Sequence, residues 1–243
     1  MPDVSADCGR GTTTNPSEFK TMKKFILCAA LVVSFGSPAL ARTALDRPVA
    51  LSTVANSLAA LEDGPPRAAL AAALDAYGRA VELGVVANTG LLTVIDYSLP
   101  SLEPRLWVLD LPNRAIVFRE LVAHGRGSGE NLATRFSNEH DSHMTSLGLF
   151  VTESSYAGSN GYSLRLRGLD KGLNDNAFDR AIVIHGAPYV NRAVAKRVGR
   201  LGRSWGCPAV RLDVARPLID AIKGGSVVFA YGPRAVGKPK QAG

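Results

Sequence analysis

The chain has 243 residues, with 28 lysines and arginines against 21 aspartates and glutamates, a formal net charge of +7 and a pI of about 9.5. This length is enough for one domain with a modest extra segment. The basic residues are scattered along the chain and form no nucleic-acid-binding motif, which argues against a nucleic acid as partner.

The first 41 residues have the pattern of an export signal. Residues 22–24 are a basic start, residues 25–35 are apolar, and residues 39–41 are a small-residue cleavage site. Residues 1–21 are polar, so we expect translation to begin at Met22. The apolar run is too short to cross a bilayer of roughly 30 Å, and no later run approaches that length. An uncleaved signal anchor is the alternative.

We therefore expect residues 1–41 to be removed and the protein to lie in the periplasm or cell envelope. The positive charge then suits an anionic envelope of peptidoglycan carboxylates, wall polymers and lipid head groups.

Residues 42–85 are predicted to form an N-terminal helical segment. Within it, residues 67–82 have apolar side chains at helical spacing, namely Leu70, Leu74, Tyr77 and Val81. A proline precedes this stretch and a glycine follows it, as at the two ends of a helix.

Residues 86–243 are predicted to form one mainly β domain, a sandwich or partly closed barrel with a few short helices. The strands are expected at residues 91–97, 106–111, 115–123, 147–152, 163–168 and 181–185, and residues 226–231 are expected to close the sheet. Residues 190–198 are predicted as a short helix or a basic loop. Residues 212–223 are predicted as a helix with Asp213 as its N-cap.

His185 and Cys207 are the candidate catalytic pair. His185 follows an apolar run with β-branched residues and is expected at the mouth of a buried strand. An imidazole that removes the proton of a thiol creates a thiolate–imidazolium pair, at a pH far below the free thiol pKa of about 8.5. Once the leader is removed, Cys207 is the remaining cysteine and has no disulfide partner. A buried, inert thiol is the alternative.

The order of strand, His-Gly, basic loop and G-R-S-W-G-C-P-A resembles the L,D-transpeptidase catalytic domain family, in the branch with that cysteine motif. Residues 92–98, 122–129, 136–138, 145–148 and 174–177 also resemble this branch, so the similarity extends from about residue 68 to residue 231.

The resemblance implies the L,D-transpeptidase fold and an acyltransferase without a cofactor or metal. In this activity Cys207 forms a thioester with a peptidoglycan stem peptide, and His185 is the general base. Acylation by carbapenem β-lactams is also implied. If water resolves the thioester, the same site is an L,D-carboxypeptidase.

The residues around Cys207 are candidates for supporting roles. The backbone N–H groups of Trp205, Gly206 and Cys207 are expected to form an oxyanion hole. Trp205 occupies the position where the commoner family motif has histidine, so catalysis is expected to depend on His185. Ser204 is expected to orient the turn or His185 through its hydroxyl, unless it is an ordinary turn serine.

Substrate-binding candidates lie on both sides of the pair. Arg211 and Arg203 are guanidinium groups near Cys207 that could bind a stem-peptide carboxylate in a bidentate pair. The commoner motif places its arginine two residues after the cysteine, whereas Arg211 follows by four. Asn138, Thr145 and Ser146 fall where the larger family has a substrate-facing Thr-Pro-x-Gly turn.

The sequence also bears on several other functions. The segment 139–143 contains two histidines and two acids, but the chain has only four histidines and no H-E-x-x-H motif, which argues against zinc. The glycine-rich segment 124–129 lacks the lysine of a P-loop and is interpreted as a flexible loop beside the cleft. A sortase-like or papain-like hydrolase and a non-catalytic wall-binding protein remain as alternatives.

Overall fold

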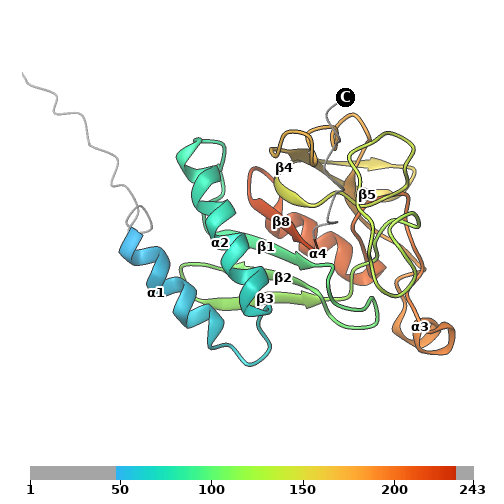
Figure 1. Cartoon of the computed structure of the whole chain (residues 1–243), viewed down its shortest axis with the longest axis horizontal. Coiled ribbons are helices and arrows are strands. Elements are labelled where there is room, and N and C mark those ends of the chain that lie inside the picture. Colours follow the sequence, from blue (N-terminus) through green and yellow to red (C-terminus); the bar gives the residue numbers. More distant parts are fainter. Residues whose placement is uncertain (1–47, 234–243) are drawn as a thin grey trace, which may run out of the picture. The chain divides into compact units, whose positions relative to one another are not determined.

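The computed structural model describes residues 48–233 (Figure 1). The predicted export signal and start site lie outside the described residues. The elements in chain order are α1 (Pro48–Ala59), α2 (Arg67–Glu82), β1 (Leu91–Asp96), β2 (Leu106–Asp110), β3 (Ala115–Glu120), β4 (Gly148–Gly158), β5 (Gly161–Gly168), β6 (Val183–Gly186), α3 (Arg192–Val198), β7 (Ala209–Val210), α4 (Leu212–Ile222) and β8 (Val227–Tyr231).

The described strands form one eight-stranded sheet in the order β3-β2-β1-β8-β4-β5-β6-β7. Its two ends come back together, because Ala123, just beyond β3, forms an antiparallel bridge with Ala209 of β7, and its N–H donates to the Ala209 carbonyl at 2.8 Å. The sheet is therefore a nearly closed barrel. The prediction of a mainly β fold with a few short helices is confirmed.

The last strand, predicted to close the sheet, lies in the middle of the strand order. β8 pairs parallel to β1 and antiparallel to β4. Sheet order depends on contacts between distant segments, which an alternating pattern along one segment does not encode.

Helix α2 packs on one face of this sheet, and the predicted residues 67–82 are the observed ones. Its side chains Leu70, Leu74 and Tyr77 are buried with Leu92 and Val94 of β1. Each large apolar side chain buried in this way contributes about 1.5–3 kcal/mol. The helical segment and the strands therefore share one core, across the domain boundary predicted at residue 85.

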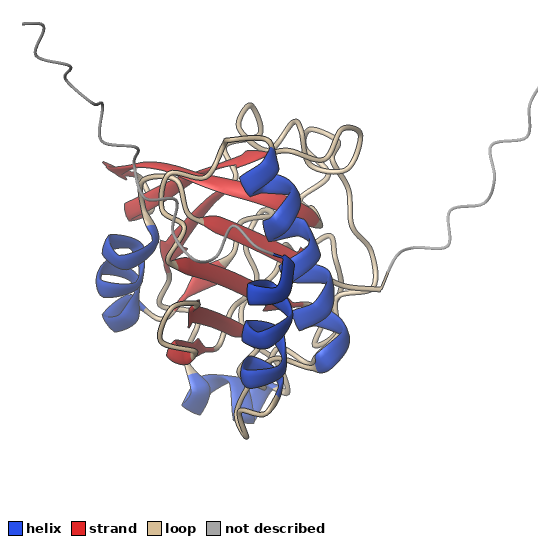
Figure 2. Ribbon diagram, turned by 90° about the vertical axis from the view of Figure 1, so that its left-hand side faces the viewer, coloured by secondary structure: helices blue, strands red, loops and turns tan. Residues whose placement is uncertain are grey.

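Helix α4 packs on the other side, with Val214, Leu218 and Ile222 in a second core that includes Ile184 of β6. Figure 2 shows helices on two sides of the strands. The predicted cap was wrong: the N-cap is Arg211, which makes no side-chain capping bond, and Asp213 lies in the first turn.

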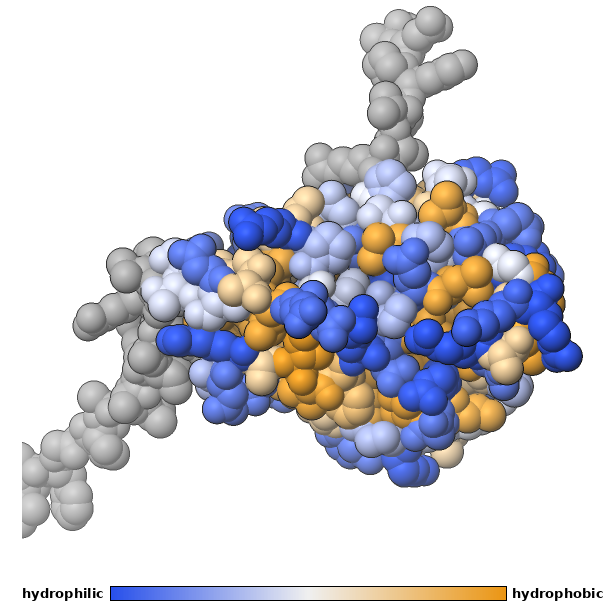
Figure 3. Space-filling view, turned by 90° about the horizontal axis from the view of Figure 1, so that it is seen from below, coloured by the Kyte–Doolittle hydropathy of each residue, from blue (hydrophilic) through white to orange (hydrophobic). Residues whose placement is uncertain are grey.

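Hydrophilic side chains cover much of the face seen in Figure 3, with apolar patches between them. Within residues 48–233, no helix has the length and apolar character needed to cross a membrane.

Candidate active site

His185 lies in β6, and Cys207 comes two residues before β7, the strand that pairs with β6. β6 and β7 are parallel, with His185 opposite Ala209, and the His185 N–H donates to the Pro208 carbonyl at 3.3 Å. The Cys207 Sγ lies 3.7 Å from the carbonyl oxygen of Ala181, which leads into β6. The sheet therefore brings the thiol against the segment that carries His185. In the described part of the chain, no hydrogen bond joins Sγ to the imidazole.

The imidazole of His185 is oriented by the backbone carbonyl of the next residue. Nδ1 lies 3.0 Å from the carbonyl oxygen of Gly186. A carbonyl only accepts hydrogen bonds, so Nδ1 carries the proton and Nε2 is left with a free lone pair. The ring is 5% exposed, and this burial lowers the pKa of His185 below its ordinary value of 6.5. The group therefore fits a neutral base at neutral pH.

The thiol of Cys207 is less acidic than the sequence led us to expect. Burial raises the pKa of Cys207, while a backbone hydrogen bond from Val183 and the charge of Arg180 act in the opposite direction without cancelling it. Desolvation thus favours the uncharged form of both partners. These two pKa directions do not favour the resting thiolate–imidazolium pair that the sequence predicted.

Ser204 holds the turn that presents Cys207. Its hydroxyl donates to the Cys207 carbonyl at 2.7 Å and accepts from the Gly206 N–H at 3.1 Å. The Gly206 N–H is thus already used within the turn, which leaves it no donor for the expected oxyanion hole. The N–H groups of Trp205 and Cys207 make no hydrogen bond to another described residue. Gly206 has φ +125°, which favours glycine.

Trp205 is 69% exposed beside this turn. The His143 ring lies 5.0 Å from it between centroids, and the Arg126 guanidinium lies 5.4 Å from the indole centroid. Trp205 lines a cavity of about 200 Å³ whose other lining residues are His140, Asp141, His143, Asp179, Arg180 and Ala181. Because Ala181 also contacts the thiol, this cavity lies beside the candidate nucleophile.

The two predicted carboxylate-binding arginines are already paired. Arg211 binds both carboxylate oxygens of Glu120 at 3.1 Å and also contacts Asp213 at 2.9 Å. Arg203 contacts Glu130 at 2.6 Å. With carboxylates of the protein on both guanidinium groups, the geometry does not support the predicted clamp.

Asn138 and Ser146 connect loops. Asn138 donates to Asp175 at 2.7 Å and accepts from the Asn176 N–H at 3.1 Å. The Ser146 hydroxyl donates to the Ser137 carbonyl at 2.9 Å. Both side chains are engaged within the protein.

Thr145 connects the loop of residues 137–146 to the cysteine turn. Its hydroxyl donates to the Gly206 carbonyl at 3.2 Å and accepts from the Gly125 N–H at 2.9 Å. It therefore positions the turn from behind.

The segment 124–129 is packed and not the flexible loop expected from its glycines. His124 is fully buried, and its Nδ1 lies 2.7 Å from Nη2 of Arg105. Burial, together with the charge of Arg105, lowers the pKa of His124 to about 4. Gly125 lies against the cysteine turn: a Cβ there would be 2.8 Å from Cα of Gly206.

Arg180 is a site residue that the sequence did not indicate. Its guanidinium lies beside the Gly206 turn and inside the loop of residues 137–146. A charged residue just before a buried strand looks like an ordinary strand end. Only the lining of the cavity and the hydrogen bonds identify it.

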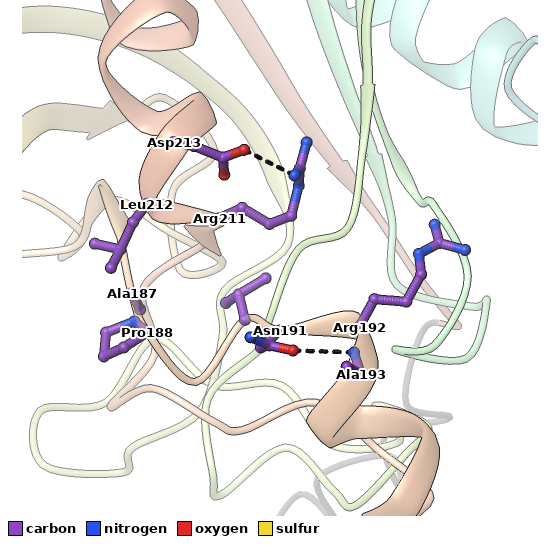
Figure 4. A pocket seen from close by; sticks show the side chains of 9 residues that line it. Ala187, Pro188, Asn191, Arg192, Ala193, Arg211, Leu212 and Asp213 are labelled. Carbon is purple, nitrogen blue, oxygen red and sulfur yellow. Dashed lines mark hydrogen bonds and ion pairs between the residues drawn. The ribbon is translucent and has the colours of Figure 1, made fainter.

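A second cavity, of about 420 Å³, lies beyond the end of β6. Figure 4 shows Arg192 at the start of α3 and Arg211 turned towards Asp213 around it. Among residues 48–233, no group of three His, Cys, Asp or Glu side chains is arranged to hold a metal ion.

The solved structures to which this chain is similar include several L,D-transpeptidases. Two similar solved structures are the L,D-transpeptidase LdtMt1 in complex with imipenem (17% identity, TM-score 0.37, 58% of each chain) and an L,D-transpeptidase from Mycobacterium smegmatis (15% identity, TM-score 0.36, 58% of each chain). A third is the L,D-transpeptidase from Xylanimonas cellulosilytica (16% identity, TM-score 0.35, 73% of this chain and 77% of that one).

The chain thus spans somewhat more than half the length of the first two structures. A search of the curated proteins gave no match. The profile of the L,D-transpeptidase catalytic domain matches residues 63–231, which is most of the chain and includes both Cys207 and His185. The chain belongs to the L,D-transpeptidase catalytic domain family.

Proposed function

We propose that the protein is an exported cysteine L,D-transpeptidase that acts on peptidoglycan stem peptides. One observation carries this proposal: within a domain matched over residues 63–231, the sheet pairs the strand of His185 with the strand that follows Cys207. The tautomer of His185, with Nε2 free to accept a proton, supports its role as the base.

In the first step, His185 Nε2 takes the thiol proton as Cys207 Sγ attacks the donor carbonyl. The S–C bond forms, and the carbonyl electron pair moves to oxygen. The resulting oxyanion is stabilised by the N–H groups of Cys207 and Trp205, which donate to no other residue in the described part of the chain. When the tetrahedral intermediate collapses, the C–N bond breaks. The imidazolium gives its proton to the leaving D-amino acid, and a thioester remains.

In the second step, the amine of an acceptor stem attacks the thioester. The new C–N bond forms, the C–S bond breaks, and His185 passes the amine proton to the leaving sulfur. Because proton transfer accompanies each attack, a neutral resting pair is sufficient. Water in place of the amine gives a trimmed stem, which is L,D-carboxypeptidase activity.

Two features support the substrate class and the compartment. The net charge of +7 favours an anionic polymer. The similar LdtMt1 structure contains imipenem, which supports β-lactams of the carbapenem class as acylating ligands of Cys207. The leader pattern of residues 22–41 supports export. N-terminal sequencing of protein recovered from the envelope should begin at Arg42.

The test is mass spectrometry of purified stem peptides incubated with the full chain. We expect a cross-linked product that has lost one terminal D-amino acid, and no such product with Cys207→Ala. The double variant Cys8→Ser/Cys28→Ser is the matched control and should keep full activity. Cross-links formed by Cys207→Ala would refute the proposal. Trimmed stems alone would indicate the carboxypeptidase, and sacculus binding without turnover a wall-binding protein.

A further inference from the structure

The side chain of Arg180 is surrounded by uncharged acceptors. Nη1 donates to the Ser137 carbonyl at 2.8 Å and to the Ser146 hydroxyl at 2.6 Å. Nη2 donates to the Met144 carbonyl at 2.7 Å and to the Ser142 hydroxyl at 3.2 Å. These bonds use all four Nη hydrogens. In the part of the chain that the structure describes, no carboxylate forms an ion pair with this guanidinium.

This arrangement differs from that of the other arginines beside Cys207. Arg203 and Arg211 each contact a carboxylate, which neutralises their charge locally. Arginine stays protonated in proteins, so the half-buried guanidinium of Arg180 is a fixed positive charge that forms no ion pair with a carboxylate of residues 48–233, although exposed Glu139 acts on it through space. A partly desolvated, unpaired charge of this kind favours an anion nearby.

The nearest candidate for that anion is the sulfur of Cys207. Nη2 of Arg180 lies 3.4 Å from the position that a Cβ on Gly206 would occupy, one residue before Cys207. The thiol itself contacts the carbonyl of Ala181, the residue that follows Arg180. The charge of Arg180 correspondingly lowers the pKa of Cys207 against the effect of burial.

The other titratable groups around the thiol are uncharged at neutral pH. Burial lowers the pKa of His185 and raises that of Tyr97; burial raises the pKa of Tyr189 to about 12. The acidic and imidazole groups near the guanidinium are half-buried His143, which packs on Trp205, and four exposed side chains that water screens: Glu139, His140, Asp141 and Asp179. The positive charge that faces the sulfur is therefore that of Arg180.

We propose, on the basis of the function above, that Arg180 is a positioning residue of the acyl transfer, whose uncompensated guanidinium charge stabilises negative charge at Cys207. The positive charge stabilises two anions. One is the thiolate that forms as His185 removes the proton, and the other is the tetrahedral oxyanion next to the new S–C bond. The hydrogen bonds to the loop of residues 137–146 keep the charge in place.

The test measures the ionisation of Cys207 directly. The full chain with Cys8→Ser/Cys28→Ser carries one thiol, and its rate of alkylation by iodoacetamide is followed from pH 5 to pH 11. Removal of a neighbouring opposite charge moves the pKa of a titrating group by about one unit or more. Arg180→Gln should therefore move the midpoint up by about one pH unit and slow alkylation about tenfold below it. Arg180→Lys, which keeps the charge, should stay close to wild type.

Arg167→Gln is the matched control. Arg167 lies on β5, and its guanidinium binds Glu153 at 2.8 Å. Its removal should leave the midpoint of Cys207 alkylation unchanged. Equal midpoints for wild type and Arg180→Gln would overturn the proposal, as would equal shifts for the Gln and Lys variants. If Arg180→Gln lacks a cooperative thermal transition, Arg180→Met replaces it. Failure of both neutral variants to fold would assign Arg180 to loop structure alone and also overturn the proposal.

This readout is independent of the peptide reaction. A shifted midpoint in a protein that makes no cross-links would support the role of Arg180 while refuting the transpeptidase. Normal cross-linking with a midpoint that Arg180→Gln does not shift would support the transpeptidase and refute the role of Arg180.

Discussion

The contact between Gly125 and the cysteine turn makes a sharp prediction for Gly125→Ala. A Cβ at residue 125 would lie 2.8 Å from Cα and 2.9 Å from N of Gly206, and would also clash with the carbonyl of His143. Carbon atoms in contact are normally about 3.5–4.0 Å apart, so the two loops would have to separate by roughly 0.7 Å or more. Because backbone lies on both sides, no side chain can rotate away.

The displacement acts on the residue before the nucleophile. A misplacement of about 1 Å at a reacting group lowers the rate by about a hundredfold. Overpacking of this kind costs about 1–3 kcal/mol of folding free energy, which is a fall in Tm of roughly 2–12 °C for a domain of this size. We therefore expect turnover to fall by about a hundredfold in a domain that still folds and unfolds cooperatively.

Turnover of stem peptides and thermal unfolding measure the two effects on one sample. Gly90→Ala is the matched control, since a Cβ there meets a single atom at an ordinary 3.6 Å. It should keep wild-type turnover and Tm. If Gly125→Ala did the same, the close packing of the two loops would be wrong, and with it the account of how the turn is positioned.

Three further predictions concern titration and ion pairs. The base must be neutral to accept a proton, and burial lowers the pKa of His185 below 6.5. On acidification, kcat/KM should therefore decline with a midpoint below pH 6.5. A midpoint above pH 6.5 would contradict this. The pKa of His124 is about 4 in the folded chain and about 6.5 in the unfolded chain, so stability present above pH 6.5 should be lost on acidification towards pH 4, by about 3 kcal/mol. Urea unfolding across this range should show the loss, and His124→Asn should flatten it. Glu120→Gln, which breaks the two-bond contact with Arg211, should cost about 1–2 kcal/mol, whereas Asp213→Asn on the same guanidinium should cost less than about 0.5 kcal/mol; equal costs in urea unfolding would refute the difference.

Local patterns predicted the elements of this fold well. The helix at residues 67–82 was predicted with its observed bounds, because Leu70, Leu74 and Tyr77 recur at helical spacing between a proline and a glycine. Most strands were located to within a few residues, although β4 continues to Gly158 through an irregular register that its polar sequence concealed. The place of β8 between β1 and β4 could not be predicted, since it depends on which distant segments pair.

The candidate site shows the same division. The chemistry of a thiol and an imidazole singled out Cys207 and His185, and the turn chemistry of Ser204 followed from its position. Sequence proximity to Cys207 favoured Arg203 and Arg211, but both bind acids contributed by other parts of the chain. The free charge comes from Arg180, 27 positions earlier, and only the folded arrangement distinguishes a paired guanidinium from an unpaired one.

The central position of β8 also bears on the order in which the chain can fold. Within the sheet, β1 is joined to β4 through β8 (Val227–Tyr231), which pairs with both of them. Before β8 is in place, β1 and β4 each have an open edge where β8 pairs in the folded chain. Because β1 and β8 are far apart in the sequence, the loop between them must close before their pairing is gained, so we expect the sheet to be completed late in folding.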